Sequence, residues 1–343
     1  MKSKTSNSPT FIVLIVVLFA LLLVNISLGS ISIPLDAIGS ILLDDPSIKS
    51  SWRHIILNYR VPKAITAILV GSGLGISGLL MQTLFRNPLA GPYVLGLSSG
   101  ASLGVAVIIL GASLFGVSFA GLLLSKWSIV LASSIGSFVV LLAVVLMSIK
   151  VKDTMAILII GLMFASVTAA IVSVLSYFST AEQLQRYIFW SFGSLGNLAT
   201  DELIILSVIT LTGLFLAVIS MKTLNSLLLG DQYARSLGLN IKKARLTIII
   251  ATSLLAGSIT AFVGPIAFVG LAIPHLTKLF FNTSNHKVLV PAVMLSGGIL
   301  LLICDSISQL PMSELTLPIN AVTSLFGAPV VIWLLVRKKK LFV

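Results

Sequence analysis

The largest group of polar and ionisable side chains lies in residues 227–245, where Gly230 and Gly238 bracket a short polar segment. The rest of the chain is almost entirely apolar. This segment offers ion pairs and hydrogen bonds, but it holds no nucleophile beside a general base, which is the arrangement that covalent catalysis needs. We therefore expect a segment that is bound by a partner on the aqueous side of a membrane.

Capping residues divide this segment. Gly230 can end one helix, Asp231 can cap a short helix that stops near Gly238, and Asn240 can cap a second short helix. The sequence therefore predicts two short helices along the membrane surface, the second carrying the cations of residues 242–245. An ordinary cytoplasmic loop would also collect cations, but it would not need paired caps.

The other residues that could do chemistry are scattered. Cys304 is the single cysteine, so neither an intramolecular disulfide nor a cysteine-rich metal site is expected, and His275 has no second ligand nearby in sequence. Gly73–Gly78 (GLGISG) matches the GxGxxG dinucleotide fingerprint, but it lies inside an apolar run without the required strand and acid. We predict helix packing for these glycines, and no metal site, cofactor site or enzyme active site.

Composition places the chain in a membrane. It has 343 residues, is 57% hydrophobic and 9% charged, and has a mean hydropathy of +1.13, whereas soluble domains are about 25% charged. The net charge of +12 comes from cations at the ends of apolar runs, which indicates membrane orientation. Nucleic-acid binding would instead need a basic surface with interleaved aromatic residues.

Apolar runs predict an all-α, polytopic membrane protein with a single transmembrane domain over residues 1–343. A crossing needs about 20 residues. Residues 1–30 resemble a signal peptide, but many spans follow, so we predict a retained first helix. The Lys and Arg distribution favours ten crossings with both termini cytoplasmic. Eight long runs and two shorter, interrupted ones are expected as helices: 11–30, 61–85, 127–149, 154–178, 201–220, 246–268, 288–308 and 319–336, then 93–111 and 269–283.

Five segments in this order, 60–104, 177–197, 229–240, 264–278 and 317–335, resemble the permease subunits of FecCD-type ABC importers for iron-siderophores, haem and cobalamin. The resemblance implies inward transport of a metal chelate, an iron-siderophore foremost, across the cell (inner) membrane of a prokaryote. It also implies two cytoplasmic ABC ATPases, an external binding protein, membrane lipid and a second permease, either an identical copy in a homodimer or a paralogue. The sequence has no GxxxxGK[ST] motif, so ATP would be used by the partner subunits and not by this chain.

The resemblance also implies roles for individual residues. The coupling loop would be 222–245, and its contacts with the ATPase would come from Gly230, Asp231, Ala234, Arg235, Leu237 and Gly238. Docking of the binding protein would use Arg53, Arg60 and Lys63, although cations near helix ends often only reach toward the membrane surface. Gln309 occupies a place that is basic in some relatives.

A gate and a pathway are implied as well, by Asn87, Leu89, Thr154, Ser173 and Ser176. The Asn87–Pro92 segment could equally be a plain turn, and serines on a helix often bond only to their own backbone.

The main alternative is an ion-coupled secondary transporter, which usually buries an acid near the middle of the membrane. The acids here map to segment ends or loops, and only Asp305, near the outer end of its helix, comes close to that pattern. The sequence does not identify the transported ligand.

Overall fold

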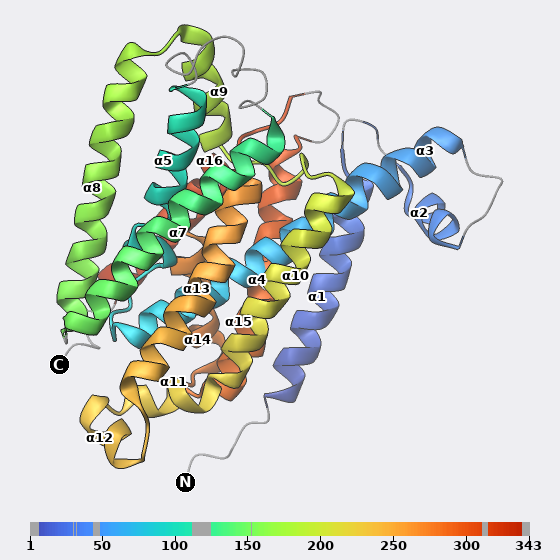
Figure 1. Ribbon diagram of the computed structural model, residues 1–343. Helices are drawn as coiled ribbons and strands as arrows, with labels where there is room; N and C mark the ends of the chain where they lie inside the picture. The colour runs from blue at the N-terminus through green and yellow to red at the C-terminus, as the bar shows by residue number, and fades with distance from the viewer. Residues whose placement is uncertain are drawn as a thin grey trace.

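The computed structural model describes residues 7–29, 31, 33–43, 49–111, 125–151, 153–310 and 315–337, and the regular structure in these ranges is entirely helical (Figure 1). Seven helices are long and apolar enough to cross a membrane, and three shorter helices are also apolar. The long ones are α1 (Ser8–Ser27), α4 (Val61–Leu84), α7 (Lys126–Lys150), α8 (Thr154–Phe178), α10 (Thr200–Ile219), α13 (Ile241–Val263) and α15 (His286–Ser308). The three shorter ones are α5 (Leu97–Ile109), α14 (Val269–Phe281) and α16 (Ile319–Arg337).

All ten predicted segments therefore appear as helices, which confirms the all-α polytopic membrane fold. The sequence missed several short elements: α2 (Leu35–Leu42), α3 (Ser50–Ile55), the π-helix Ile56–Arg60, the 3-10 helix Pro92–Leu95 and α9 (Ala181–Ser191). Two further short helices, α11 (Met221–Leu228) and α12 (Asp231–Ser236), lie in the coupling loop, and α12 is the short helix predicted between Gly230 and Gly238.

Helix α4 forms the centre of the bundle, packed against α10, α13, α14 and α15. Its glycines let backbones touch: a Cβ added at Gly71 would lie 2.1 Å from the carbonyl oxygen of Gly297, and one at Gly78 would lie 1.6 Å from that of Gly270. The hydrophobic effect does not drive helices together within lipid, so their association depends on close van der Waals packing of this kind. The predicted packing role of the 73–78 glycines is confirmed.

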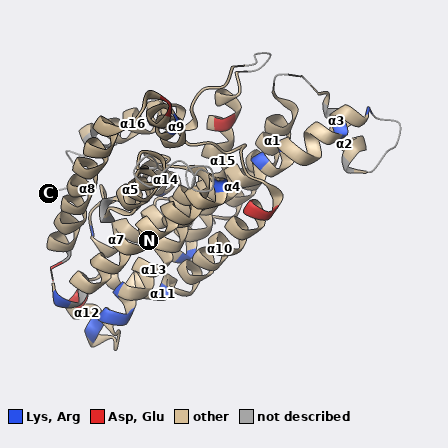
Figure 2. Ribbon diagram, turned by 45° about the horizontal axis from the view of Figure 1, so that its top comes forward, with Lys and Arg blue, Asp and Glu red and all other residues tan. Residues whose placement is uncertain are grey.

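The bundle has two differently built ends (Figure 1). We call the end with α11 and α12 the α12 end, and the end with α2, α3 and α9 the α9 end. Lys and Arg gather at the α12 end, around α12 and the start of α13 (Figure 2). Along the side of the bundle, α8 leaves most of its apolar side chains uncovered, among them Ile159, Val167 and Val174.

Candidate coupling and docking sites

At the α12 end, two glycines shape a short projecting helix. Gly230 separates α11 from α12, and Gly238 follows α12. Their φ angles are +105° and +83°, which residues with a side chain rarely adopt. After α12, the Leu239 amide donates a hydrogen bond back to the Ala234 carbonyl, at 3.0 Å. Ala234 is fully buried beneath the helix, whereas Leu237 is 58% exposed.

Two details of the predicted capping were wrong. Asp231 is the first residue of α12 and not its N-cap, which is Gly230. Its carboxylate instead accepts hydrogen bonds from Arg86 and from Arg245. Asn240 does cap a helix, since its side chain accepts the Lys243 amide at 3.1 Å, but that helix is the long α13. No Gly or Pro interrupts residues 241–256, so the helix continues into the bundle, and the two short helices are α11 and α12.

The segment after α4 is not helical, as its prolines predicted. Arg86 adopts a left-handed backbone (φ 47°), and helical structure resumes only at Pro92. The Asn87 side chain accepts the Leu89 amide at 2.9 Å, and the ring Nε2 of His275 lies 2.6 Å from the Pro88 carbonyl oxygen. His275 is buried in this contact with the loop, and the described residues contain no group of three His, Cys, Asp or Glu side chains that could hold a metal.

The other gate and pathway candidates lie on α8. Asp153 caps this helix by accepting the Met155 amide at 3.0 Å. Thr154 begins the helix, but its side chain lies outside the described residues. Ser173 is exposed and its hydroxyl bonds back to Ala169 at 2.9 Å, and Ser176 is partly buried on the same helix. The two serines therefore lie on α8, a helix whose surface is largely exposed because few other segments of this chain pack against it.

At the α9 end, the predicted docking cations separate into different roles. Arg60 is only 9% exposed, and its guanidinium donates to the backbone carbonyls of Ile26 (2.9 Å), Ser27 (2.8 Å) and Ile31. These carbonyls lie at the end of α1 and just after it, so the charge of Arg60 is already engaged within the chain, and its role in docking stays a prediction. Arg53 is half-buried in α3 and closer to solvent.

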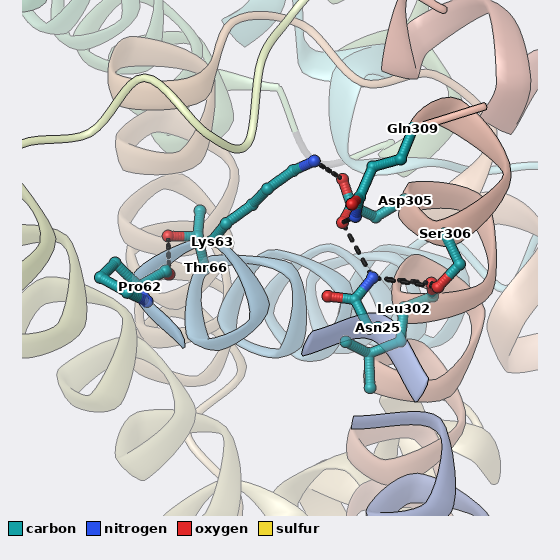
Figure 3. Close-up of polar contacts among 8 residues, drawn as sticks. All are labelled: Asn25, Pro62, Lys63, Thr66, Leu302, Asp305, Ser306 and Gln309. Carbon is teal, nitrogen blue, oxygen red and sulfur yellow. Dashed lines mark hydrogen bonds and ion pairs between the residues drawn. The ribbon is translucent and has the colours of Figure 1, made fainter. Parts of the chain in front are cut away.

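Lys63 belongs to a polar cluster around Asp305 that joins three helices (Figure 3). Its ammonium lies 3.0 Å from one carboxylate oxygen of Asp305, which is 1% exposed. The other oxygen accepts from the Asn25 amide at 2.9 Å and from the Gln309 amide at 2.8 Å. A buried carboxylate needs such partners, and Gln309 supplies one of them.

This cluster borders a cavity of about 710 Å³ between the start of α4, the loop after α9 and the α15–α16 connection. Phe189 and Phe192 line its apolar side, and Lys63 and Asn197 are among its polar groups. Asp305 stands out in the sequence, whereas Asn25 was not predicted, although an amide inside the apolar run of α1 was the available clue. The Arg86–Asp231 pair was not predicted either, because the two residues are far apart in sequence.

Comparisons with known proteins agree with this architecture. The model of the FecCD transport family matches residues 14–337. The hemin transport system permease protein HmuU of Yersinia pestis is 34% identical over 322 residues, which cover 93% of this chain and 94% of that protein. The vitamin B12 import system permease protein BtuC of Klebsiella pneumoniae is 33% identical over 293 residues, 85% of each chain.

A solved structure described as an inward-facing conformation of an ABC transporter of the metal-chelate type superimposes with a TM-score of 0.82 at 29% identity, covering 96% of this chain and 99% of that one. The predicted family is thereby confirmed, and with it the absence of a cofactor or an ATPase site of the chain's own. ATP is hydrolysed by partner subunits in this family, and the complex also implies a binding protein. The chain belongs to the FecCD transport family and is the permease subunit of a metal-chelate type ABC importer.

Proposed function

We propose that this permease carries its chelate inward across the cell (inner) membrane of a prokaryote, with the α12 end and both termini in the cytoplasm. The cations around α12 and the start of α13 support this orientation, because cytoplasmic segments collect Lys and Arg. Residues 1–343 would act as one transmembrane domain, with the coupling loop at 222–245. Two ABC ATPases would bind the α12 end of a permease dimer.

The observation that carries this proposal is the side-chain arrangement of α12. Ala234 anchors the helix on the bundle at 0% exposure, while Tyr233 and Leu237, four residues apart, are 55% and 58% exposed. Arg235 is exposed between them. One aromatic side chain, one aliphatic side chain and one cation are thus exposed on a short helix whose Ala234 is buried. This combination suits a protein partner, since aromatic residues and Arg are enriched in interface cores.

The second permease, an identical copy or a paralogue, would cover α8. This helix exposes apolar side chains along its length, and it carries no charge between Asp153 and Glu182. An uncharged wall that includes Ser173 and Ser176 suits a bulky chelate that must move through without being held. Asn87, Leu89 and Thr154 would form the gate at the cytoplasmic end of this pathway.

The external binding protein would dock at the α9 end, over the cavity beside Lys63 and near Arg53. Arg60 and Lys63 line this cavity while their charges are engaged by backbone carbonyls and by Asp305, and Arg53 in α3 is the third cation of the predicted docking set. Complementary charges of this kind steer association and fix its register.

For the transported ligand we propose an iron-siderophore, with haem and cobalamin as alternatives. HmuU and BtuC are named for hemin and vitamin B12 transport, so the family accommodates several chelates. The ATPase activity of the assembled complex, measured with each ligand on its binding protein, distinguishes these choices. Stimulation by haem or cobalamin and not by iron-siderophores would overturn the choice of ligand while leaving the transporter class intact.

The coupling proposal is tested by capture of the ATPase subunit on the detergent-solubilised permease. We expect the variant Arg235→Glu with Leu237→Glu to lose at least about tenfold in ATPase affinity, as hot-spot residues do. Lys287→Glu is the control for charge reversal, because it replaces one exposed cation by a carboxylate at the same end, at the start of α15 and away from α12. Equal ATPase binding by the double variant and the wild type would contradict the proposal.

A further inference from the structure

Three separate segments meet on the carboxylate of Asp231. One oxygen accepts from Arg86, which follows α4, and the other accepts from Arg245 in α13 at 2.8 Å. Asp231 itself is the first residue of α12. The carboxylate therefore ties α12 on one side to α13, its neighbour in sequence, and on the other side to the loop of residues 86–91.

The backbone is unusual on both sides of the contact between Arg86 and α12. Arg86 has φ 47°, a left-handed conformation that costs about 1–2 kcal/mol for a residue with a side chain. Gly230, just before Asp231, has φ +105°, and a Cβ built on it would lie 3.8 Å from a guanidinium nitrogen of Arg86. Strained backbone persists only where surrounding contacts enforce it, and it gathers at functional sites.

The far side of the same loop is held by α14. The Pro88 carbonyl oxygen contacts His275 Nε2 at 2.6 Å, and His275 is buried. Just before the loop, the Gln82 amide of α4 donates to the Leu271 carbonyl of α14 at 3.2 Å. Within the loop, Asn87 bonds to the Leu89 amide through its side chain and to the Ala90 amide through its carbonyl. Loop 86–91 is therefore a short, internally braced segment fixed between α12 and α14.

We propose that the Arg86–Asp231 ion pair is the link through which movement of α12 reaches loop 86–91, and that Arg245 is a positioning residue that orients Asp231. This inference rests on the proposed function, in which an ATPase binds α12. Because the loop is braced internally, a displacement of α12 moves Arg86 and the rest of the loop together. Arg86 is 45% exposed and Asp231 32% exposed, so the pair can break and re-form at modest cost during a transport cycle.

The two arginines supply a matched pair of variants. Arg86→Gln and Arg245→Gln each leave Asp231 with one arginine, so their loss of charge is the same, but only Arg86→Gln detaches the loop from α12. In proteoliposomes with the ATPase and binding protein, we expect Arg86→Gln to retain ATPase binding and basal ATP hydrolysis. Ligand transport is expected to fall about tenfold, a factor that is typical of coupling between two sites. Arg245→Gln is expected to transport within about threefold of wild type. Arg86→Lys keeps the charge and is expected to recover most of the transport.

A second readout follows the loop itself. The Leu89 side chain is 45% exposed and Cys304 is buried, so a thiol reagent can report on Leu89→Cys selectively. We expect ATP binding to change the labelling rate in the otherwise wild-type complex and in Arg245→Gln, but not in Arg86→Gln. Equal transport by Arg86→Gln and Arg245→Gln, or a nucleotide response at position 89 that survives Arg86→Gln, would overturn the link. Failure of the wild-type chain to bind any ATPase would instead overturn the proposed function.

Discussion

The two ends of the bundle each use one carboxylate to join segments that are distant in sequence, but they do so in opposite environments. Asp305 at the α9 end is 1% exposed and is surrounded by Lys63 and the amides of Asn25 and Gln309. Asp231 at the α12 end is 32% exposed and is held by two arginines. The Asp305 carboxylate is buried between packed helices, whereas the Asp231 carboxylate lies on α12, which projects from the bundle.

This difference in exposure distinguishes a junction that keeps its geometry from one that can change during transport. A buried carboxylate with three partners is costly to disturb, because removing one partner leaves uncompensated polar groups in an apolar setting. A partly exposed carboxylate can exchange its partners with water at little cost. We therefore expect the α9 end to hold its geometry through transport, while the α12 end carries the movement that the ATPases drive.

The largest expected effect comes from removing the sealed carboxylate. Asp305→Ala would leave Lys63, Asn25 and Gln309 without their shared acceptor, and we expect it to lower the free energy of unfolding by about 3 kcal/mol. Asp231→Ala is the matched variant, and we expect a loss of at most about 1 kcal/mol, since both its ion pairs are partly exposed. Reversible unfolding in mixed micelles measures both. Equal losses would show that the two carboxylates do not differ in the way described.

A smaller effect is expected for docking at the α9 end. Arg53→Gln should weaken association with the binding protein by about threefold at low salt, with the difference shrinking as salt screens the charge. Lys242→Gln is the control, because it removes the same charge from an exposed position at the start of α13, at the opposite α12 end. Surface-immobilised permease in nanodiscs provides the binding measurement. An effect of Lys242→Gln equal to that of Arg53→Gln would remove Arg53 from the docking surface.

The sequence predicted most of the fold because its strongest patterns are local. Apolar runs located the ten helices, closely spaced glycines indicated backbone packing, and Asn240 was correctly identified as a cap. The errors arose where a side chain had a distant partner. Asp231 looked like a cap because Arg86 lies far away in sequence, and Arg60 looked available to a partner because the carbonyls that hold it, at the end of α1 and just after it, are distant in sequence.

The most direct test of the account is a photo-crosslink from α12. A photoreactive amino acid in place of Leu237, whose side chain is 58% exposed at the end of α12, should capture the ATPase subunit in the assembled, active complex. The same group in place of Tyr59, which is 60% exposed near the α9 end, should not capture it. Capture from position 237 alone is the predicted result. An active complex in which position 237 never reaches the ATPase would contradict the coupling role of α12.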